Sequence, residues 1–310
     1  MKLTLHARLP FNFRSVIQSH GWVQLAPCGF DESTATFTYV DRLSTGRVVE
    51  YGISEAPDGV QVQTESLTQS EQAEVKEKVR WMFALDSDFS VFYKAARKEP
   101  KLRDAEKLAR GRVLRSPTLF EDVVKTILTT NTLWGATKRM TLNLIHQFGE
   151  PLTTHSPERS RRKLAAQSKD ETTETKRAFP TPQSIAASNP EVLKEKVRVG
   201  YRASAIHQLA VRTASGEFDL EALKSSSLPT LELRKELLTI NGVGPYAAAN
   251  LLLILGRSDF IPIDSWALKL VSHEWHDGKP VSAKDVEKHF EKWGEFKGFA
   301  FWFWDWKEQG

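Results

Sequence analysis

Two features of this sequence are best suited to chemistry: a tight glycine turn and a carboxylate that follows it. The turn is Ile240-Asn241-Gly242-Val243-Gly244, and the carboxylate is Asp264, eighteen residues after Tyr246. A carboxylate stabilises a positive charge that develops beside it, and it can orient or deprotonate water. Asp is also a preferred residue before a helix, so Asp264 would serve equally as the cap of a helix that begins at Ser265. The two roles are compatible, because a helix N-terminus favours the ionised carboxylate.

The glycine turn has the sequence of a helix-hairpin-helix. Gly242 and Gly244 tolerate positive φ and the close approach of another backbone, and Pro245 suits the first turn of the next helix. The N–H groups of the turn and of the helix N-terminus then face outward, which suits a phosphate. Such contacts position a protein on a nucleic-acid backbone without reading its sequence. A plain helix–helix turn has the same pattern, so Gly242, Val243 and Gly244 are candidate backbone-binding residues.

The elements that position these residues change type along the chain. Alternating apolar residues predict strands over residues 1–65, with a hairpin turn at Asp58-Gly59. From about residue 68 the apolar spacing becomes helical and stays so to the end. Ser116-Pro117 predicts a helix start, and one buried face follows between Phe120 and Leu128. We therefore predict an α+β protein, with an antiparallel sheet first and helices after it.

The domain organisation follows from the same change. We predict a strand-rich N-terminal domain over residues 1–90 and a helical domain over residues 91–310. Within the second, residues 154–178 are rich in Ser, Thr, Lys, Arg and Glu and almost lack large apolar side chains, which indicates a flexible surface insertion. The helix-hairpin-helix occupies residues 231–257.

Composition excludes several classes of protein. The net charge of +4 and the pI near 9.0 are compatible with nucleic acid without proving it. Cys28 is the single cysteine, which excludes an intrachain disulfide and a four-cysteine iron–sulfur cluster. No apolar stretch reaches the ~20 residues of a membrane span. His273-Glu274-Trp275-His276 lacks the four-residue histidine spacing of zinc proteases, so we interpret these as surface histidines.

The hairpin, Asp264 and the preceding Ile261-Pro262-Ile263 together resemble the core of the helix-hairpin-helix DNA glycosylases. These base excision repair enzymes flip out a damaged base and cut its glycosidic bond. The resemblance covers roughly residues 68–310, and it implies an N-terminal antiparallel sheet followed by a mainly helical, two-lobed domain with the cleft between its lobes. It also implies that Asp264 is the catalytic carboxylate, because glycosidic cleavage develops positive charge on the deoxyribose.

Two further segments resemble oxoguanine glycosylases. Asn131 falls where the family inserts a side chain into the gap left by the flipped base, although it could simply cap its helix. Gly200-Tyr201-Arg202-Ala203 is similar to a motif in which the tyrosine wedges beside the partner base and the arginine bonds it. The alternative for this segment is a core tyrosine and a surface arginine.

The base pocket implied by the resemblance is closer to that of alkyladenine glycosylases. Bifunctional members carry a nucleophilic lysine two residues after the second hairpin glycine, where this chain has Tyr246. A tyrosine cannot form the imine that strand cleavage by this route requires. Phe296, in the aromatic tail of the chain, is a second pocket candidate, with core packing as its alternative.

We therefore expect a monofunctional DNA glycosylase that removes an alkylated purine from duplex DNA. The alternatives are a glycosylase for oxidised purines or deaminated bases, and a noncatalytic binder of DNA structures. We expect a monomer whose partner is double-stranded DNA with a damaged base, and no membrane partner. We expect no cofactor, although the hairpin is compatible with a monovalent cation. The expected location is the cytoplasm or nucleoid in a prokaryote and the nucleus in a eukaryote.

Overall fold

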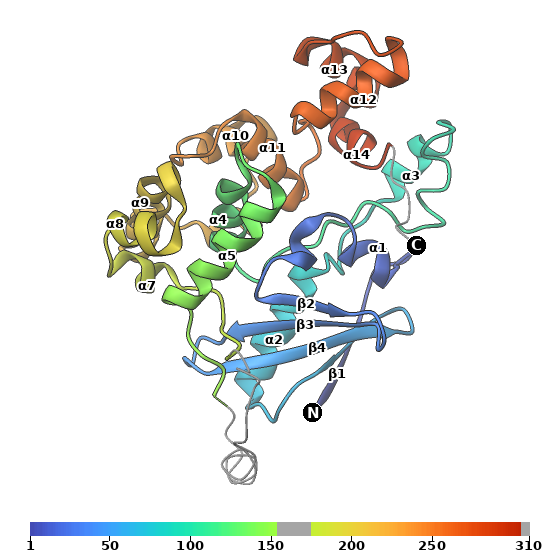
Figure 1. The fold of residues 1–310 in the computed structure, drawn as a ribbon. Helices are drawn as coiled ribbons and strands as arrows, with labels where there is room; N and C mark the ends of the chain where they lie inside the picture. Colours follow the sequence, from blue (N-terminus) through green and yellow to red (C-terminus); the bar gives the residue numbers. More distant parts are fainter. Residues whose placement is uncertain (154–174, 305–310) are drawn as a thin grey trace.

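The computed structural model describes residues 1–153 and 175–304 (Figure 1). A five-stranded antiparallel sheet forms the N-terminal part, in the order β1-β5-β4-β3-β2. Helices make up most of the rest, which confirms the predicted α+β class. The strands are β1 (Lys2–His6), β2 (Cys28–Asp31), β3 (Thr36–Arg42), β4 (Val48–Ala56) and β5 (Gly59–Gln63).

The hairpin between β4 and β5 lies one residue earlier than predicted. Ala56 pairs with Gly59, so the turn consists of Pro57 and Asp58, and Asp58 has φ of 56°. Gly59 is a strand residue instead, where a Cβ would lie 2.0 Å from the carbonyl oxygen of Leu5. The close approach of β1, and not the turn, therefore requires the glycine.

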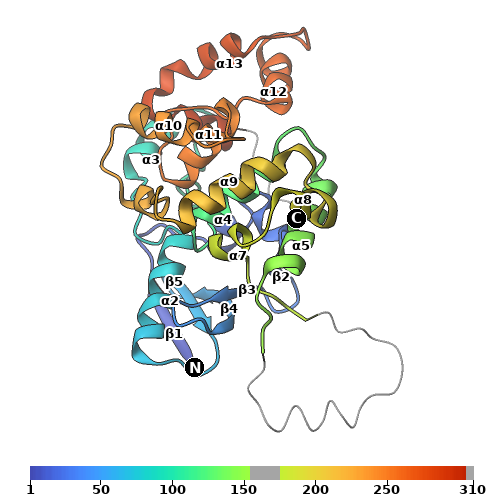
Figure 2. The ribbon, with the colours of Figure 1, turned by 90° about the vertical axis from the view of Figure 1, so that its left-hand side faces the viewer.

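One long helix, α2 (Gln69–Met82), packs against the sheet in both ribbon views (Figures 1 and 2). It begins with a capping box, in which Thr68 and Glu71 each bond the other's backbone N–H. Val75, Val79 and Met82 of this helix are fully buried in the same hydrophobic core as the sheet. Their spacing is the helical period that the sequence shows after residue 68.

The remaining helices form two lobes, as predicted (Figure 1). The larger lobe shares its hydrophobic core with the sheet, and the smaller lobe has a core of its own. The larger lobe contains α4 (Leu119–Thr129), α5 (Trp134–Phe148), α7 (Pro182–Ala186), α8 (Pro190–Val192), α9 (Ala203–Ala214), α10 (Thr230–Leu238) and α11 (Pro245–Ile254). The smaller lobe contains α3 (Ser90–Ala96), α12 (Ser265–Trp275), α13 (Ala283–Phe290) and α14 (Lys297–Trp302).

Short helical segments connect these elements. A five-residue helix, α1 (Phe13–Ile17), precedes β2. The others are the single turns Gly21–Gln24, Leu193–Val197, Gly200–Arg202, Glu221–Ser225 and Glu291–Phe296.

The central helix α4 begins two residues later than the sequence suggests. Thr118 caps it and accepts a bond from the N–H of Glu121 at 3.2 Å, so the predicted cap at Ser116-Pro117 is wrong. The N–H of Ser116 donates instead to Asp122 Oδ1 at 3.0 Å. Every residue from Leu119 to Leu128 is buried, and not one face alone, because both the sheet and other helices pack around α4.

The predicted insertion lies mostly outside the described residues, since residues 154–174 are not among them. At its edges Pro151 and Arg177 form an antiparallel bridge, so the described chain leaves and returns at neighbouring points. The predicted domain boundary at residue 90 stays a prediction.

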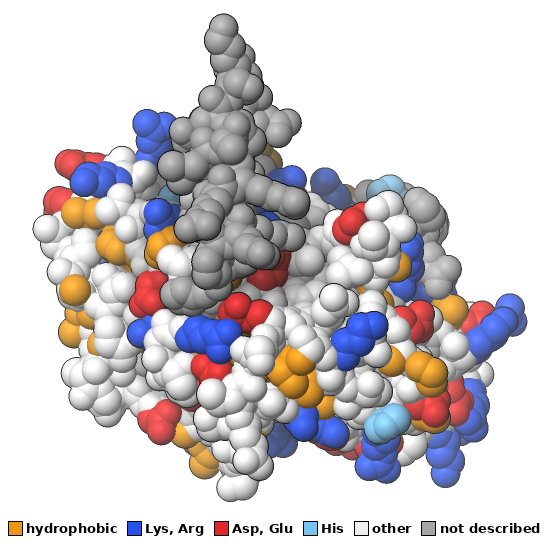
Figure 3. Space-filling model, turned by 90° about the horizontal axis from the view of Figure 1, so that it is seen from below, with side chains coloured by type: hydrophobic (Ala, Val, Ile, Leu, Met, Phe, Trp, Pro, Cys, Tyr) orange, Lys and Arg blue, Asp and Glu red, His pale blue; other side chains and the backbone are white. Residues whose placement is uncertain are grey.

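The molecular surface around this edge carries charges of both signs. Seen from below, Lys and Arg side chains are interspersed with Asp and Glu (Figure 3). The described part of this face therefore presents charges of mixed sign and no continuous positive field. Among the described residues, no helix is long and apolar enough to cross a membrane.

Candidate active site

Asp264 caps helix α12 and remains exposed. Its Oδ1 accepts two bonds, from the N–H groups of Trp266 and Ala267, each at 2.9 Å. Both bonds use the same oxygen, so Oδ2 takes no part in the cap. The structure therefore makes Asp264 a helix cap whose second oxygen is left for another partner, which fits both roles considered from the sequence.

A cavity of about 310 Å³ opens beside Asp264. Residues from both helical lobes and from the N-terminal part line it: Tyr246 of α11, Trp134 of α5 and Trp302 of α14 are examples. A smaller cavity of about 260 Å³ adjoins it and shares Tyr246, Asp264 and Trp302. Most of the larger side chains around both cavities are aromatic: His20, Trp22, Trp134, Tyr246, Trp266, Phe301 and Trp302.

The charge of these two cavities is set by one residue. Among the described residues that line them, Asp264 is the only carboxylate, and none is a lysine or arginine. His20 does not change this, because burial, opposed by its bond to Leu114 and helped by the charge of Lys125, lowers its pKa to about 4. The imidazole is therefore neutral at neutral pH.

The His20 ring is fixed at both nitrogens. Nε2 lies 2.7 Å from the carbonyl oxygen of Leu114, so Nε2 carries the proton and donates it. Nδ1 accepts the N–H of Trp22 at 3.3 Å. With both nitrogens engaged, His20 offers the cavity no free hydrogen-bond donor.

The N-terminal segment that carries His20 is fastened to the helical lobes. The indole N–H of Trp302 donates to the carbonyl of Ser19 at 2.9 Å, and that of Trp134 donates to Gln24 Oε1 at 2.8 Å. The Trp134 ring lies so close to Gly21 that a Cβ on this glycine would be 2.4 Å from Cζ2. Gly21 is thus required for Trp134 to form this wall.

Tyr246 lies half-buried in the wall between the hairpin and Asp264. Burial first, and the charge of Asp264 second, raise the pKa of its hydroxyl. The phenol therefore stays protonated at neutral pH.

The hairpin joins α10 to α11, as the sequence predicts. Gly242 has φ of +84°, which favours glycine, and it packs close to Ala205. A Cβ on Gly244 would meet no atom within 4 Å, so another molecule can approach this backbone. Val243 differs from its neighbours, because its side chain is buried and its N–H donates to the carbonyl of Ile240. Of the three candidates, only the two glycines present an exposed backbone.

The sequence from residue 124 to residue 296 matches the family model described as "HhH-GPD superfamily base excision DNA repair protein". This chain belongs to the HhH-GPD superfamily. It is a DNA glycosylase of that superfamily, and the match spans the hairpin, Tyr246 and Asp264.

Solved structures share the fold of this chain over 98% of its length. MBOgg1 in complex with a low-affinity DNA ligand is 25% identical, with a TM-score of 0.69 over 93% of that chain. The 3-methyladenine DNA glycosylase of Archaeoglobus fulgidus is 20% identical, with a TM-score of 0.70 over 97% of that chain. The 8-oxoguanine glycosylase/lyase of Clostridium acetobutylicum, in complex with double-stranded DNA, is 21% identical, with a TM-score of 0.69 over 96% of that chain. No curated protein sequence matches significantly.

These neighbours include proteins named for alkylated and for oxidised purines, so they do not select the lesion. Within the described residues, no group of three or more His, Cys, Asp or Glu side chains is placed to hold a metal ion. A monovalent cation at the hairpin of the glycosylase stays a prediction.

The structure brings Asn131, Tyr201 and Arg202 together beside the end of α4. Tyr201 is 68% exposed and Arg202 is 6% exposed, so the alternative of a core tyrosine and a surface arginine is wrong. Asn131 has φ of +46°, just after the α4 cap residue Thr130, and its amide lies 3.5 Å from the Tyr201 hydroxyl. Asn131 therefore lies one residue beyond the cap of α4, in place of capping the helix itself, and it is exposed.

Arg202 differs most from its predicted role. Its guanidinium donates to the carbonyls of Ile127, Val199 and Thr130, and so supports the loop that carries Asn131. Sequence reasoning also missed Leu133, which is 82% exposed on the same loop. A large apolar residue at the position before a helix start, here α5, is the sequence pattern that could have predicted this exposed side chain.

Phe296 does not lie in the cavity beside Asp264. It lines a separate cavity, where its ring lies 5.9 Å from that of Phe92. The physical reason is its position before α14, next to α3, whereas Trp302 at the far end of α14 reaches the Asp264 cavity. The aromatic tail does supply a wall of that cavity, but through Trp302. The sequence pattern did not identify His20, Trp22 and Trp134 as residues of this cavity. The glycine between His20 and Trp22 could have indicated a close contact there.

Proposed function

We propose that this glycosylase hydrolyses the N-glycosidic bond of a damaged base in duplex DNA, with Asp264 as the catalytic carboxylate. The observation that supports this most is that one exposed carboxylate opens onto a cavity with aromatic walls. A flipped base stacks on such walls, and each stacking contact contributes ~1–3 kcal/mol. Tyr246 and Trp302, together with His20, line both cavities alongside Asp264.

The chemistry follows from the position of Asp264. As the glycosidic bond breaks, positive charge develops on the deoxyribose, and the carboxylate stabilises it electrostatically. Oδ1 stays with the N–H groups of α12, which leaves Oδ2 to orient or deprotonate the attacking water. The water oxygen bonds to the sugar carbon, and the base departs with the bonding electrons.

The same cavity supports a monofunctional enzyme. A strand-cleaving glycosylase of this type needs an amine to form an imine with the sugar. No lysine is among the described residues that line the two cavities, and Tyr246 occupies the corresponding hairpin position. We therefore infer that the product is an intact strand with an abasic site.

The charge of the cavity favours an alkylated purine as substrate. Alkylation at N3 or N7 makes a purine cationic, and a cation is attracted to aromatic faces and to a carboxylate. The neutral His20 adds no repelling charge. A cationic base is also a good leaving group. The second candidate is an oxidised purine, which is favoured by the cluster of Asn131 and Tyr201 that resembles oxoguanine enzymes.

We place the DNA across three exposed features of the larger lobe. The open backbone at Gly244 approaches a phosphate, while Tyr201 and Leu133 project as large exposed side chains. Exposed apolar side chains of this kind can enter a base step. A noncatalytic binder would have the hairpin but would gain nothing from a carboxylate close to phosphates.

A panel of duplexes, each with one lesion, tests the proposed function. We expect base release from N-alkylated purine duplexes, strand breaks only after alkali, and no covalent adduct on borohydride reduction. Release of 8-oxoguanine but not of alkylated purines would contradict the substrate. A trapped adduct would show that an amine attacks the sugar and would contradict the monofunctional assignment.

A further inference from the structure

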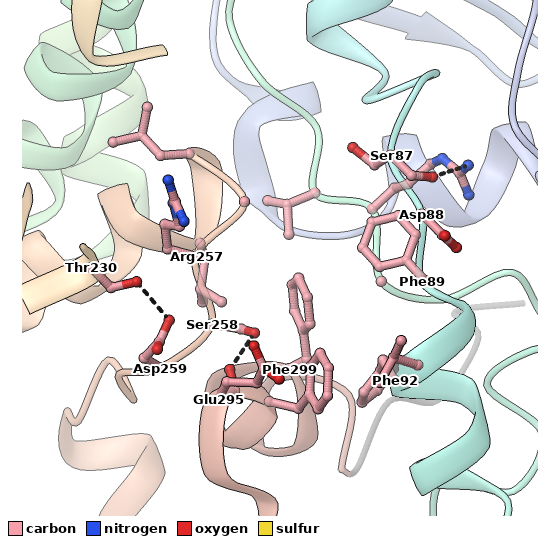
Figure 4. Close-up of a pocket in the computed structure, with 18 of the residues that line it drawn as sticks. Ser87, Asp88, Phe89, Phe92, Thr230, Arg257, Ser258, Asp259, Glu295 and Phe299 are labelled. Carbon is pink, nitrogen blue, oxygen red and sulfur yellow. Dashed lines mark hydrogen bonds between the residues drawn. The ribbon is translucent and has the colours of Figure 1, made fainter. Parts of the chain in front are cut away.

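A third cavity, of about 580 Å³, is separate from the 310 Å³ cavity beside Asp264. The two share only Val113 and Leu253 among their described lining residues. Figure 4 shows Arg257, Ser258 and Asp259 on one side, Ser87 and Phe89 on the other, and Phe299 between them. Its volume lies within the ~300–1,000 Å³ range of small-molecule sites.

The unusual member of this cavity is Arg115. It is only 8% exposed, and it forms no ion pair with any described carboxylate. Its Nε has no hydrogen-bond partner, and Nη1 reaches the Trp81 carbonyl at 3.5 Å, which is a poor bond. Its remaining contact is the Trp81 ring, 4.2 Å from the guanidinium carbon. Burial lowers the pKa of Arg115 to about 10.

A buried charge without an ion-pair partner is costly, and the nearby charge of Asp122 offsets only part of that cost for Arg115. Arg112, Lys224 and Arg257 also line the cavity and add positive charge, and Arg112 lies over the Phe89 ring and bonds backbone carbonyls. Lys224 is paired with Glu221, whereas Arg257 bonds only a backbone carbonyl, that of Ser226. The excess positive charge at this end of the cavity comes from Arg115 and Arg257.

Three carboxylates of the described residues line the cavity, and two of them bond other groups. Asp88 pairs with Arg8 at 2.6 Å, and Asp259 accepts the Thr230 hydroxyl at 3.0 Å. Glu295 lines the cavity as well, and its backbone carbonyl accepts the Ser258 hydroxyl. None of them forms an ion pair with Arg115 or Arg257.

The opposite part of the cavity is aromatic. Phe89 and Phe299 lie with ring centres 5.7 Å apart, and Phe92 and Phe296 extend this surface. An anion-binding end next to an aromatic surface suits a molecule with a charged group and a flat ring. Arginine forks match the oxygens of phosphate better than a point charge does.

We propose that this cavity binds a small phosphate monoester of mononucleotide size, with the phosphate at Arg115 and Arg257 and the ring against Phe89 and Phe299. The site does not depend on the proposed base-removal activity.

Binding to the full chain tests this with three probes: inorganic phosphate, deoxyadenosine 5′-monophosphate and deoxyadenosine. By isothermal titration calorimetry, we expect the nucleotide to bind more tightly than phosphate, and deoxyadenosine not to bind detectably. Equal binding of nucleotide and nucleoside, or no binding of either phosphate compound, would overturn the proposal.

Variants locate the binding. Arg115→Met and Arg257→Gln should each weaken nucleotide affinity by about tenfold or more, whereas Arg14→Gln, at the distant exposed pair with Glu32, should not. If Arg115→Met does not fold, Arg257→Gln carries the test. Tyr246→Ala should leave the affinity unchanged. Loss of binding in Tyr246→Ala, or full binding in both arginine variants, would place the nucleotide elsewhere.

Discussion

The carboxylate of Asp264 and the hydroxyl of Tyr246 line one cavity, and the charge of Asp264 adds to burial in raising the pKa of Tyr246. Tyr246 is also only two residues after Gly244, the most open point of the hairpin. Gly244, where we propose that a phosphate binds, therefore lies at the start of α11, next to Tyr246, where we propose that a base stacks. Binding of the DNA backbone at the hairpin would therefore determine the position of a flipped base relative to Asp264.

Gly244→Arg should weaken binding to all duplexes to a similar degree. The site is open and φ is −91°, so the side chain fits the fold but occupies the space where a phosphate approaches. We expect about tenfold weaker binding or more, an unchanged melting temperature, and a small effect of Gly244→Ala. Wild-type binding should also fall steeply with salt in a fluorescence anisotropy titration. Affinity that changes with neither salt nor this substitution would contradict binding at the hairpin.

Arg202→Ala should destabilise the loop that carries Asn131. The substitution removes the guanidinium donor from the carbonyls of Ile127 and Thr130, at a cost of about 1–3 kcal/mol. Single-turnover rates on lesion duplexes should fall more than nonspecific binding does, and Arg202→Lys should recover part of both. Chemical denaturation and rates opposite each of the four bases measure this.

The opposite-base profile separates two roles for Arg202. If it acts through the loop, Arg202→Ala and Asn131→Ala should alter the profile in the same way. A profile altered only by Arg202→Ala would mean that the arginine leaves its carbonyls and bonds the partner base directly.

Stability should depend on pH through His20. The unfolded chain takes up a proton near the ordinary pKa of 6.5, but the folded protein does so only near 4. Stability is therefore complete above pH 6.5 and is lost as the pH falls toward 4. The loss is at most about 3 kcal/mol, because His20 is only partly buried and solvent screens part of its charge. Urea denaturation at pH 7 and pH 4.5 should show a smaller loss for His20→Gln than for the wild type. Equal losses would contradict a buried neutral histidine.

Much of the fold could be predicted because it depends on local patterns. The alternation around Val60 and Val62 gives a strand, and the helical spacing after residue 68 gives α2. Two boundaries were misplaced where a second residue competed for the same role. Thr118 caps α4 in place of Ser116, because the hydroxyl oxygen of Ser116 accepts from Lys125 Nζ and its N–H donates to Asp122.

The cavity walls could not be predicted in the same way. Ser19 and Trp302 are bonded across 283 residues of sequence, and no local period indicates such a contact. Asp264 and Tyr246 could be paired from the sequence, because the resemblance fixes their spacing. Phe296 and Trp302 are both aromatic residues of one short tail. Phe296 precedes α14 and Trp302 ends it, so the two side chains line different cavities, and the sequence pattern does not distinguish them.

Single-turnover base release by Asp264→Asn tests the account most directly. The substitution preserves size and removes the charge proposed to stabilise the sugar, together with a like charge that faces the phosphates. We predict that release from an N-alkylated purine duplex becomes undetectable, while affinity for the same duplex stays equal or becomes tighter. Near-normal release by this variant would show that Asp264 only caps α12 and that another group performs the chemistry.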